Sequence, residues 1–176
     1  MNYLKGKDIF LRPVEISDLD ALYEWENDPS AWEVSNTVNP FSKFYLEQYI
    51  LNAQNNIYAD KQLRLIAETH AGDLVGAIDL FEFDAHHRRC GIGILIGEPF
   101  RKKGYASQAL DLVITYGEKA LKLHQLFCGI NQNNQVSLKL FQKKGFEITG
   151  CRKQWNLLAN GYSDEYFLQR MLKPGL

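Results

Sequence analysis

The sequence lacks long apolar runs, a strong net charge and paired cysteines. No stretch approaches the roughly 18 consecutive apolar residues that a membrane-spanning helix requires, and no apolar signal segment follows the first residues. We therefore expect a cytoplasmic protein with no membrane partner. The formal net charge is only −1, and clustered basic residues fall in two short runs, at 88–89 and 101–103. Local positive charge of this kind predicts a small anionic ligand rather than a nucleic acid.

Cysteine is sparse: Cys90, Cys128 and Cys151 are widely spaced, and no C-x-x-C pair is present. Each lies in or near an apolar run, so we expect three buried, reduced thiols and no metal site. The segment Asp84-x-His86-His87 contains metal-ligand residue types. Adjacent side chains of an extended segment point opposite ways, so this segment predicts a polar turn instead.

The 176 residues suffice for one domain with a real core, and no repeat, linker or low-complexity tract divides them. We expect a single domain over 1–176 with a core at about 7–172. Alternation, periodicity and turn residues predict an α/β (α+β) fold with a mixed sheet. The expected strands are 7–12, 63–68, 74–83, 88–96, 125–130, 146–157 and 162–171, and the expected helices are 17–27, 42–53, 104–121 and 136–144.

The most informative segment runs from Ile94 to Ala106. An apolar strand ends near Gly97 and Pro99, and the pattern Arg-x-x-Gly-x-Ala then opens a long amphipathic stretch. The first turn of a helix leaves backbone N–H groups without partners, and the helix dipole adds positive charge there. Glycine in such a turn allows close approach of a ligand, and alanine keeps the turn thin. We therefore predict a pyrophosphate-binding cradle made by Arg101, Lys102, Lys103, Gly104, Tyr105 and Ala106.

Two other nucleotide-binding patterns do not fit. The P-loop pattern G-x-x-x-x-G-K-[S/T] is absent. Gly91-x-Gly93-x-x-x-Gly97 has one residue too many for a dinucleotide fingerprint, and its glycines lie within the strand instead of after it.

A second block lies downstream of the cradle. It contains Asn134-x-x-Ser137 and then Lys143-Lys144-Gly145-Phe146. With Arg101–Ala106 as the hallmark Gln/Arg-x-x-Gly-x-Gly/Ala, the chain resembles the GNAT superfamily of acetyl-CoA-dependent N-acetyltransferases over about 7–172. The resemblance implies a mostly antiparallel seven-stranded sheet flanked by about four helices and splayed between strands 4 and 5. Acetyl-CoA would be the cosubstrate, and the positions implied to bind it are the cradle together with Ile94, Leu95, Ile96, Asn131, Asn134 and Ser137.

Two branches of the superfamily are similar. His87-Arg88-Arg89, Tyr116-Gly117 and the terminal hairpin resemble spermidine/diamine N-acetyltransferases. Asn134-Gln135-Val136 and the segment 150–154 resemble ribosomal-protein alanine N-acetyltransferases. The acceptor is therefore expected to be a primary amine, on a polyamine, another small molecule or a protein N-terminus. The resemblance also leaves a homodimer open.

The catalytic residues of both branches are largely replaced. Phe141 stands where the polyamine branch has a proton-donating tyrosine, and Gly91 stands where it has a glutamate. Asn156 stands where the ribosomal branch has a glutamate, whereas its serine is present as Ser137. We therefore predict Ser137 as the group that assists the departing thiolate. Asp79 is a candidate proton acceptor through water, with Glu82 as the alternative.

Acceptor-side candidates are Trp32, Glu82 and Asp164, the last beside Glu165 in the final hairpin. The expected activity is acetyl transfer by direct attack of a neutral amine within a ternary complex. Phe141, Gly91 and Asn156 favour one alternative: an acyl-CoA-binding or sensing module with weak catalysis or none.

Overall fold

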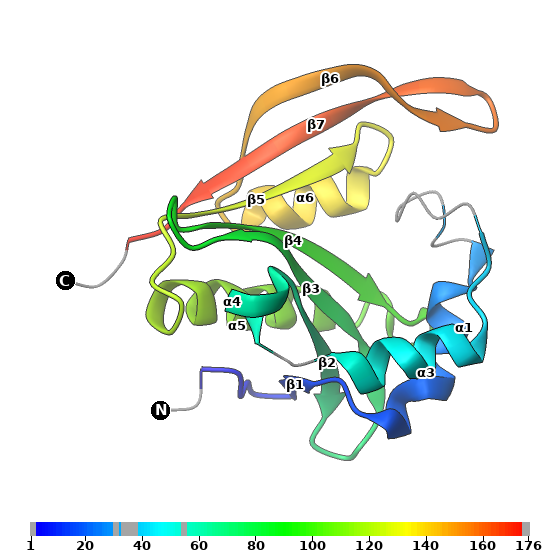
Figure 1. Cartoon of the computed structure of the whole chain (residues 1–176). Helices are drawn as coiled ribbons and strands as arrows, with labels where there is room; N and C mark the ends of the chain where they lie inside the picture. The colour runs from blue at the N-terminus through cyan, green and yellow to red at the C-terminus, as the bar shows by residue number, and fades with distance from the viewer. Residues whose placement is uncertain (1–2, 30–31, 33–38, 54–55, 174–176) are drawn as a thin grey trace.

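The computed structural model describes residues 3–29, 32, 39–53 and 56–173 (Figure 1). A seven-stranded sheet in the order β1-β2-β3-β4-β5-β7-β6 forms its centre, with β4 and β5 parallel and the other pairs antiparallel. The strands are β1 Ile9–Pro13, β2 Leu63–Thr69, β3 Leu74–Asp84, β4 Arg89–Ile96, β5 Gln125–Asn131, β6 Glu147–Leu158 and β7 Gly161–Met171. The described α-helices are α1 Leu19–Glu26, α3 Lys43–Asn52, α4 Ile57–Asp60, α5 Tyr105–Lys119 and α6 Gln135–Lys143.

The mixed sheet and its strands confirm the expected fold class, with two local differences. Strand β1 continues through Pro13, which is tolerated because β1 is an edge strand and proline has no N–H to pair. Helix α4 was not expected because four residues are too short to show helical periodicity. Its start is set by Asn56, whose side chain accepts a hydrogen bond from the Tyr58 N–H at 3.1 Å.

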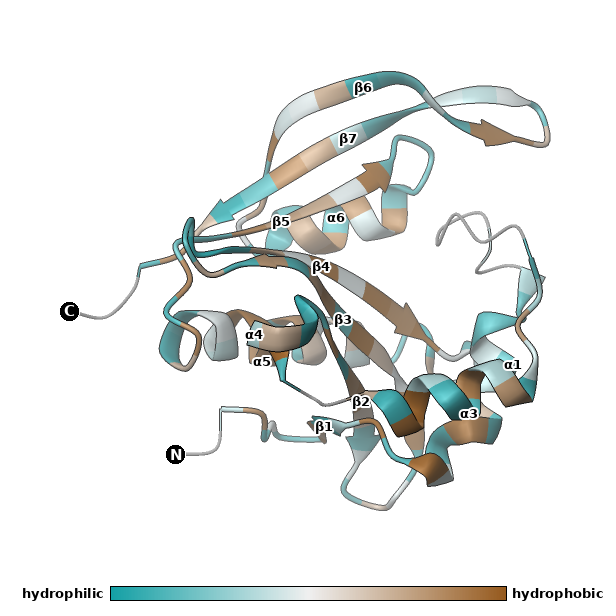
Figure 2. Cartoon of the chain, viewed as in Figure 1, coloured by the Kyte–Doolittle hydropathy of each residue, from teal (hydrophilic) through white to brown (hydrophobic). Residues whose placement is uncertain are grey.

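Two helical layers cover the sheet. Helices α5 and α6 pack on one face, where Leu110 and Phe141 join sheet residues such as Leu80 and Leu126 in the larger core. Helices α1 and α3 pack on the other face over β2 and β3, in a smaller core. Figure 2 shows the apolar stretches along β4 and β5 that this layering buries. The smaller core consists of Val14, Leu22, Leu46, Ile50, Ile66 and Ala77.

Strands β4 and β5 part after a short pairing. Three residues of β4, from Arg89 to Gly91, pair with Gln125 to Phe127 of β5. Beyond them the two strands diverge, as Figure 1 shows, while Ile94–Ile96 stay paired with β3 on their other side. The structure therefore has the splay that the resemblance implied, and one backbone edge of β4 faces the gap.

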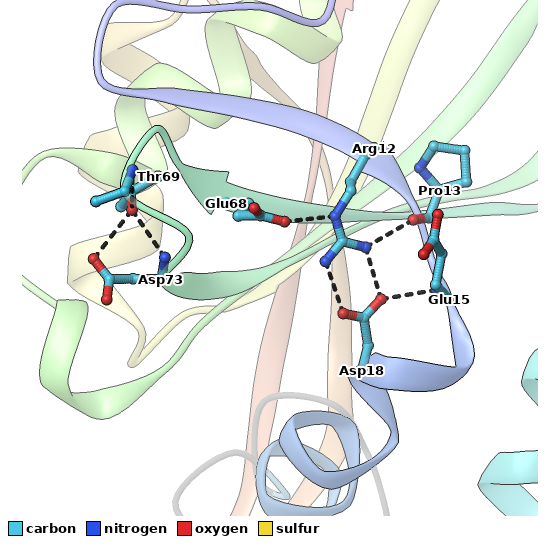
Figure 3. A network of polar contacts seen from close by, with 8 residues as sticks. Arg12, Pro13, Glu15, Asp18, Glu68, Thr69 and Asp73 are labelled. Carbon is cyan, nitrogen blue, oxygen red and sulfur yellow. Dashed lines mark hydrogen bonds and ion pairs between the residues drawn. The ribbon is translucent and has the colours of Figure 1, made fainter.

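A buried polar network holds β1 to the turn before α1 (Figure 3). Arg12 donates two hydrogen bonds of 2.8 Å to the carboxylate of Asp18 and one of 2.6 Å to Glu68. The Glu15 N–H donates to Asp18 at 2.8 Å. Asp18 is only 1% exposed, so these bonds replace the water that its charge has lost.

The prediction of three buried thiols is wrong for one of them. Cys90 and Cys128 are buried, whereas Cys151 is exposed. Cys151 lies on β6, an edge strand of the sheet. An apolar stretch of sequence on such a strand need not be covered by a helix.

Within residues 3–29, 32, 39–53 and 56–173, no helix has the length and apolar character needed to cross a bilayer. Among the same residues, no group of three or more His, Cys, Asp or Glu side chains is placed to hold a metal ion.

Candidate active site

The cradle forms where β4 leads into α5. Gly104 is the N-cap of α5 with φ +84°, and Lys102 has φ +62°, so the backbone turns sharply before the helix begins. A Cβ atom added at Gly104 would meet no atom within 4 Å, which leaves open space above the turn. Arg101, Lys102 and Lys103 are exposed around it. The unpaired N–H groups of the first turn and these cations give the turn a local positive charge of the kind that favours a phosphate anion.

Contacts within the cradle fix two of its cations. The Arg101 Nε donates to the Ile96 carbonyl at 3.0 Å, and its Nη2 lies 3.4 Å from the Asp28 carboxylate. The Lys103 ammonium lies 5.4 Å from the ring centroid of Phe100, which also contacts Tyr105. Positive charge is thus held beside the end of β4.

The second motif block lies on the other side of the splay, where β5 leads into α6. Asn134 caps α6, its Oδ1 accepting from the Ser137 N–H at 3.1 Å, and Ser137 is half-buried. At the end of β5, Asn131 Oδ1 accepts from the Asn133 N–H at 2.8 Å and from the Ser163 hydroxyl at 3.0 Å. Asn131 Nδ2 is the one buried side-chain polar atom without a partner in the described part of the chain. An unsatisfied buried donor of this kind suits a ligand oxygen.

Glycine and phenylalanine residues lie side by side on the α1/α3 face of the sheet at the splay. Gly91 is the last residue of β4 paired to β5, and a Cβ added to it would lie 2.3 Å from the ring of Phe81. That ring lies 6.1 Å from the ring of Phe127, which lies 5.6 Å from the ring of Phe167. The Phe81 ring, the first of this row of three, therefore occupies the place where the polyamine branch would carry its glutamate.

The two other replaced positions, Phe141 and Asn156, are both buried. Phe141 packs edge-on against Phe146 with centroids 5.0 Å apart. Asn156 is 8% exposed and pairs with Ser163 across the final hairpin. Phe141 has no proton to donate, and the Asn156 amide cannot accept one as a base would.

A charged cluster lies on the same face, between β2, β3 and α1. It consists of Arg64, Asp79 and Glu26, and we call it the Arg64 cluster. Arg64 donates to both oxygens of Asp79, at 2.7 and 2.9 Å, and to Glu26 at 2.5 Å. It also stacks over Tyr49, where burial, the largest influence, raises the pKa of the phenol and keeps it neutral. Each oxygen of Asp79 thus accepts one hydrogen bond from the guanidinium. Sequence reasoning missed Arg64 and Glu26 because the cluster joins segments far apart in the chain.

The cluster borders a hollow of about 320 Å³, which we call the α3 hollow. Its wall includes Glu26, Tyr45, Tyr49, Arg64, Asp79 and Phe81. Two carboxylates against one guanidinium give this wall a net negative charge beside aromatic rings, an environment that suits an organic cation.

The three predicted acceptor-side residues are not gathered together. Trp32 donates its indole N–H to the Glu26 carbonyl at 2.8 Å and so lies beside the α3 hollow. Glu82 is exposed at the β3 bulge with φ +48°. Asp164 instead supports the irregular part of β6, accepting from Lys153 at 2.7 Å and from the Gln154 N–H at 2.9 Å. These hydrogen bonds, with that of Lys153 the larger influence, lower the pKa of Asp164.

The neighbouring Glu165 has a different environment. It is 7% exposed, and its Oε1 lies 2.9 Å from Nη1 of Arg152. The carboxyl group lies against Gly129 of β5 and approaches within 2.8 Å of the place where a Cβ of that residue would stand. A buried carboxylate therefore lies beside the splay on the β5 side.

Comparison with known proteins agrees with this geometry. Residues 8–147 match the family model of the acetyltransferase (GNAT) domain. A probable N-acetyltransferase YjcK of Bacillus subtilis is 26% identical over 97% of each chain. Spermidine N(1)-acetyltransferase of Escherichia coli is 26% identical over 80% of this chain and 73% of its own. The crystal structure of Vibrio cholerae spermidine N-acetyltransferase with CoA and spermine has a TM-score of 0.88 at 20% identity, covering 96% of this chain and 98% of its own.

The matched region contains the cradle, the splay and the start of α6, the three features built above from the residues. Because the family model matches most of its length, the chain belongs to the GNAT family of acetyltransferases.

Proposed function

We propose that this enzyme transfers the acetyl group of acetyl-CoA to a primary amine by direct attack within a ternary complex. The observation that carries the proposal is the splay of β4 and β5 beside the cradle at the start of α5. The cradle offers cations and first-turn N–H groups to a pyrophosphate, and the edge of Ile94–Ile96 that does not pair with β5 offers backbone groups to an amide-containing arm. One ligand that carries both chemistries is acetyl-CoA.

Acetyl transfer has three requirements that the residues at the splay must meet. A primary amine has a pKa near that of lysine, about 10.4, so it must first release one proton to the surrounding water before it attacks. Backbone N–H groups of β4 would stabilise the negative charge that develops on the thioester oxygen. The N–C bond then forms as the C–S bond breaks, and the second amine proton goes to the thiolate. We assign the Ser137 hydroxyl to hydrogen-bond that sulfur, because Phe141 cannot.

The acceptor side supports an amine with a second positive group. The α3 hollow combines net negative charge with aromatic rings, and Trp32 donates a hydrogen bond to the backbone carbonyl of Glu26, a residue of its wall. Asp79 would act there electrostatically, since Arg64 donates a hydrogen bond to each of its oxygens. Glu82 on β3 and Asp164 on β7 would contribute only long-range attraction. A homodimer remains an expectation, which the mass of the protein in solution tests.

Acetyl-CoA turnover over an amine panel tests the proposal. The panel contains spermidine, a diamine, lysine and a peptide with N-terminal alanine, and CoA release is the readout. Release with at least one amine is expected. Tight acetyl-CoA binding without turnover on any amine would instead establish the acyl-CoA-binding module that Phe141, Gly91 and Asn156 favour.

Substitutions in the cradle test the cofactor side separately. Replacing Lys102 and Lys103 with alanine should weaken acetyl-CoA binding by about tenfold or more, since charge-assisted phosphate contacts are lost. The matched control is Lys119→Ala, an exposed lysine at the other end of α5. Calorimetric Kd values for both variants check this, and an equal effect of the control would contradict the placement.

A further inference from the structure

Two glycines face the gap at the splay. Gly93 and Gly129 each stand two residues beyond Gly91 and Phe127, the last pair of β4 and β5. They share the α1/α3 face with those residues because side chains alternate along a strand. We call the pair Gly93 and Gly129 the glycine window. Neither glycine has a side chain of its own, so an acceptor that approaches the gap from this face meets only the neighbouring side chains.

A carboxylate stands on each side of the window. Asp79 pairs with Gly93 from β3, and its Cβ lies 3.7 Å from where a Cβ of Gly93 would stand. Glu165 lies over Gly129 from β7, with Cδ and Oε1 at 2.8 Å and Oε2 at 3.2 Å from the corresponding place. The two carboxylates therefore compete for the role of receiving the amine.

Their hydrogen bonds separate them. Asp79 is held by Arg64 through both oxygens. Among the residues that the structure describes, Arg152 is the one hydrogen-bond partner of the Glu165 carboxylate and bonds Oε1, which leaves Oε2 for a ligand. Arg152 in turn is fixed between the rings of Trp155 and Phe167, at 5.0 and 5.6 Å. Arg152 thus fixes the Glu165 carboxylate, while Oε2 can still accept a hydrogen bond. Because Glu165 is nearly buried, a hydrogen bond to it is stronger than the same bond in water.

Building on the acetyl transfer proposed above, we infer that Glu165 receives the acceptor amine: its Oε2 accepts a hydrogen bond from the amine nitrogen at the glycine window. The nitrogen is then oriented toward the gap where β4 and β5 part. This contact positions the amine and adds no covalent step to the transfer. It also gives a functional reason for glycine at 129, since any side chain there would displace the carboxylate.

The test compares Glu165→Gln with Glu147→Gln, an exposed carboxylate on the adjacent strand β6. Steady-state kinetics with the best amine of the panel and the Kd for acetyl-CoA are measured for each. We expect Glu165→Gln to lower kcat/KM for the amine by at least about tenfold. The Kd for acetyl-CoA should stay within about twofold of the wild-type value, and Glu147→Gln should match wild type in both.

A merely structural role is separated by the double variant Glu165→Gln/Arg152→Gln. If Glu165 only neutralises Arg152, removing both charges restores kcat/KM, and the inference is overturned. If Glu165 receives the amine, the double variant stays as low as Glu165→Gln. Gly129→Ala supplies an independent arm, because its new Cβ pushes the carboxylate away, and the same selective loss is expected if Glu165→Gln does not fold.

Two further results would overturn the inference. Wild-type kinetics in Glu165→Gln would do so, as would a selective loss in Asp79→Asn alone, which would place the amine on the β3 side. Both leave the proposed acetyl transfer intact. Absence of turnover by the wild-type enzyme on every amine would instead overturn the proposed function and this inference together.

Discussion

The three cysteines differ in reactivity because they differ in burial. Burial raises the pKa of Cys90 to about 12 and also raises that of Cys128 to about 12, where the Glu165 carboxylate acts in the same direction. Cys151 is exposed on β6. Only the thiolate reacts readily with electrophiles, and both high pKa and burial suppress it.

Thiol labelling should therefore distinguish Cys151 from the other two. In the folded protein at about pH 8, a disulfide reagent is expected to modify Cys151 alone. In denaturant, all three cysteines of the chain should react. Cys151→Ser should abolish the reaction of the folded form, and rapid residual labelling of that variant would contradict the burial of Cys90 and Cys128.

Asp18 should contribute to stability in a pH-dependent way. Burial alone would raise its pKa, but hydrogen bonds from Arg12 and the Glu15 N–H outweigh burial and lower it. A lowered folded-state pKa means that the stabilisation is present above about pH 4 and is lost as the pH falls further.

Asp18→Asn is accordingly expected to cost about 3 kcal/mol of unfolding free energy at neutral pH, since it leaves Arg12 half-paired. The difference from wild type should shrink below about pH 4. Urea unfolding at neutral and acidic pH measures both. The matched control is Asp20→Asn, whose exposed pair with Lys43 should change nothing measurable; a pH-independent deficit in Asp18→Asn would refute this account.

At the scale of elements, short sequence patterns predicted the helices and strands that depend mainly on neighbouring residues. Helix α3 begins after Ser42, at the start of the expected helix 42–53, and the strands around Gly91 and Gly129 lie where they were expected. Helix α6 begins one residue earlier than expected, after Asn134. The cradle could be predicted too, because all its residues are contiguous. The Arg64 cluster could not be, since strand register and helix packing bring Glu26 and Asp79 to it.

The contact between Gly91 and Phe81 makes a prediction about strand β4. Gly91→Ala should cost about 1–3 kcal/mol, because the new Cβ would overlap the Phe81 ring. Gly93→Ala is the control on the same strand, where the nearest atoms lie at 3.7 Å or more. That change should be neutral or slightly stabilising. Thermal or urea unfolding compares the two, and equal costs would show that the ring does not constrain residue 91.

At the scale of the whole molecule, the sheet consists of two parts joined by a short seam. Strands β1 to β4 form one part, and β5, β7 and β6 form the other, with three residue pairs between β4 and β5. Helices α5 and α6 share the core beneath this seam. A ligand lying in the gap would therefore contact both parts.

Acetyl-CoA binding should consequently protect both parts from hydrogen exchange at once. Slower exchange is expected at 92–96 on β4 and in the first turn of α6, because ligand contacts oppose local opening. The edge strand β1 serves as the internal control and should be unchanged. Protection limited to the first turn of α5 would show that the ligand is held by its phosphates alone.

The overlap between residue 91 and the Phe81 ring also restricts the order in which this enzyme can change by mutation. A glutamate at position 91 has no room while the phenyl ring lies across it. A smaller side chain at 81 would open that room at the cost of part of the aromatic row with Phe127. The two positions are therefore epistatic: residue 81 must change first, and the path that starts at residue 91 passes through a destabilised protein.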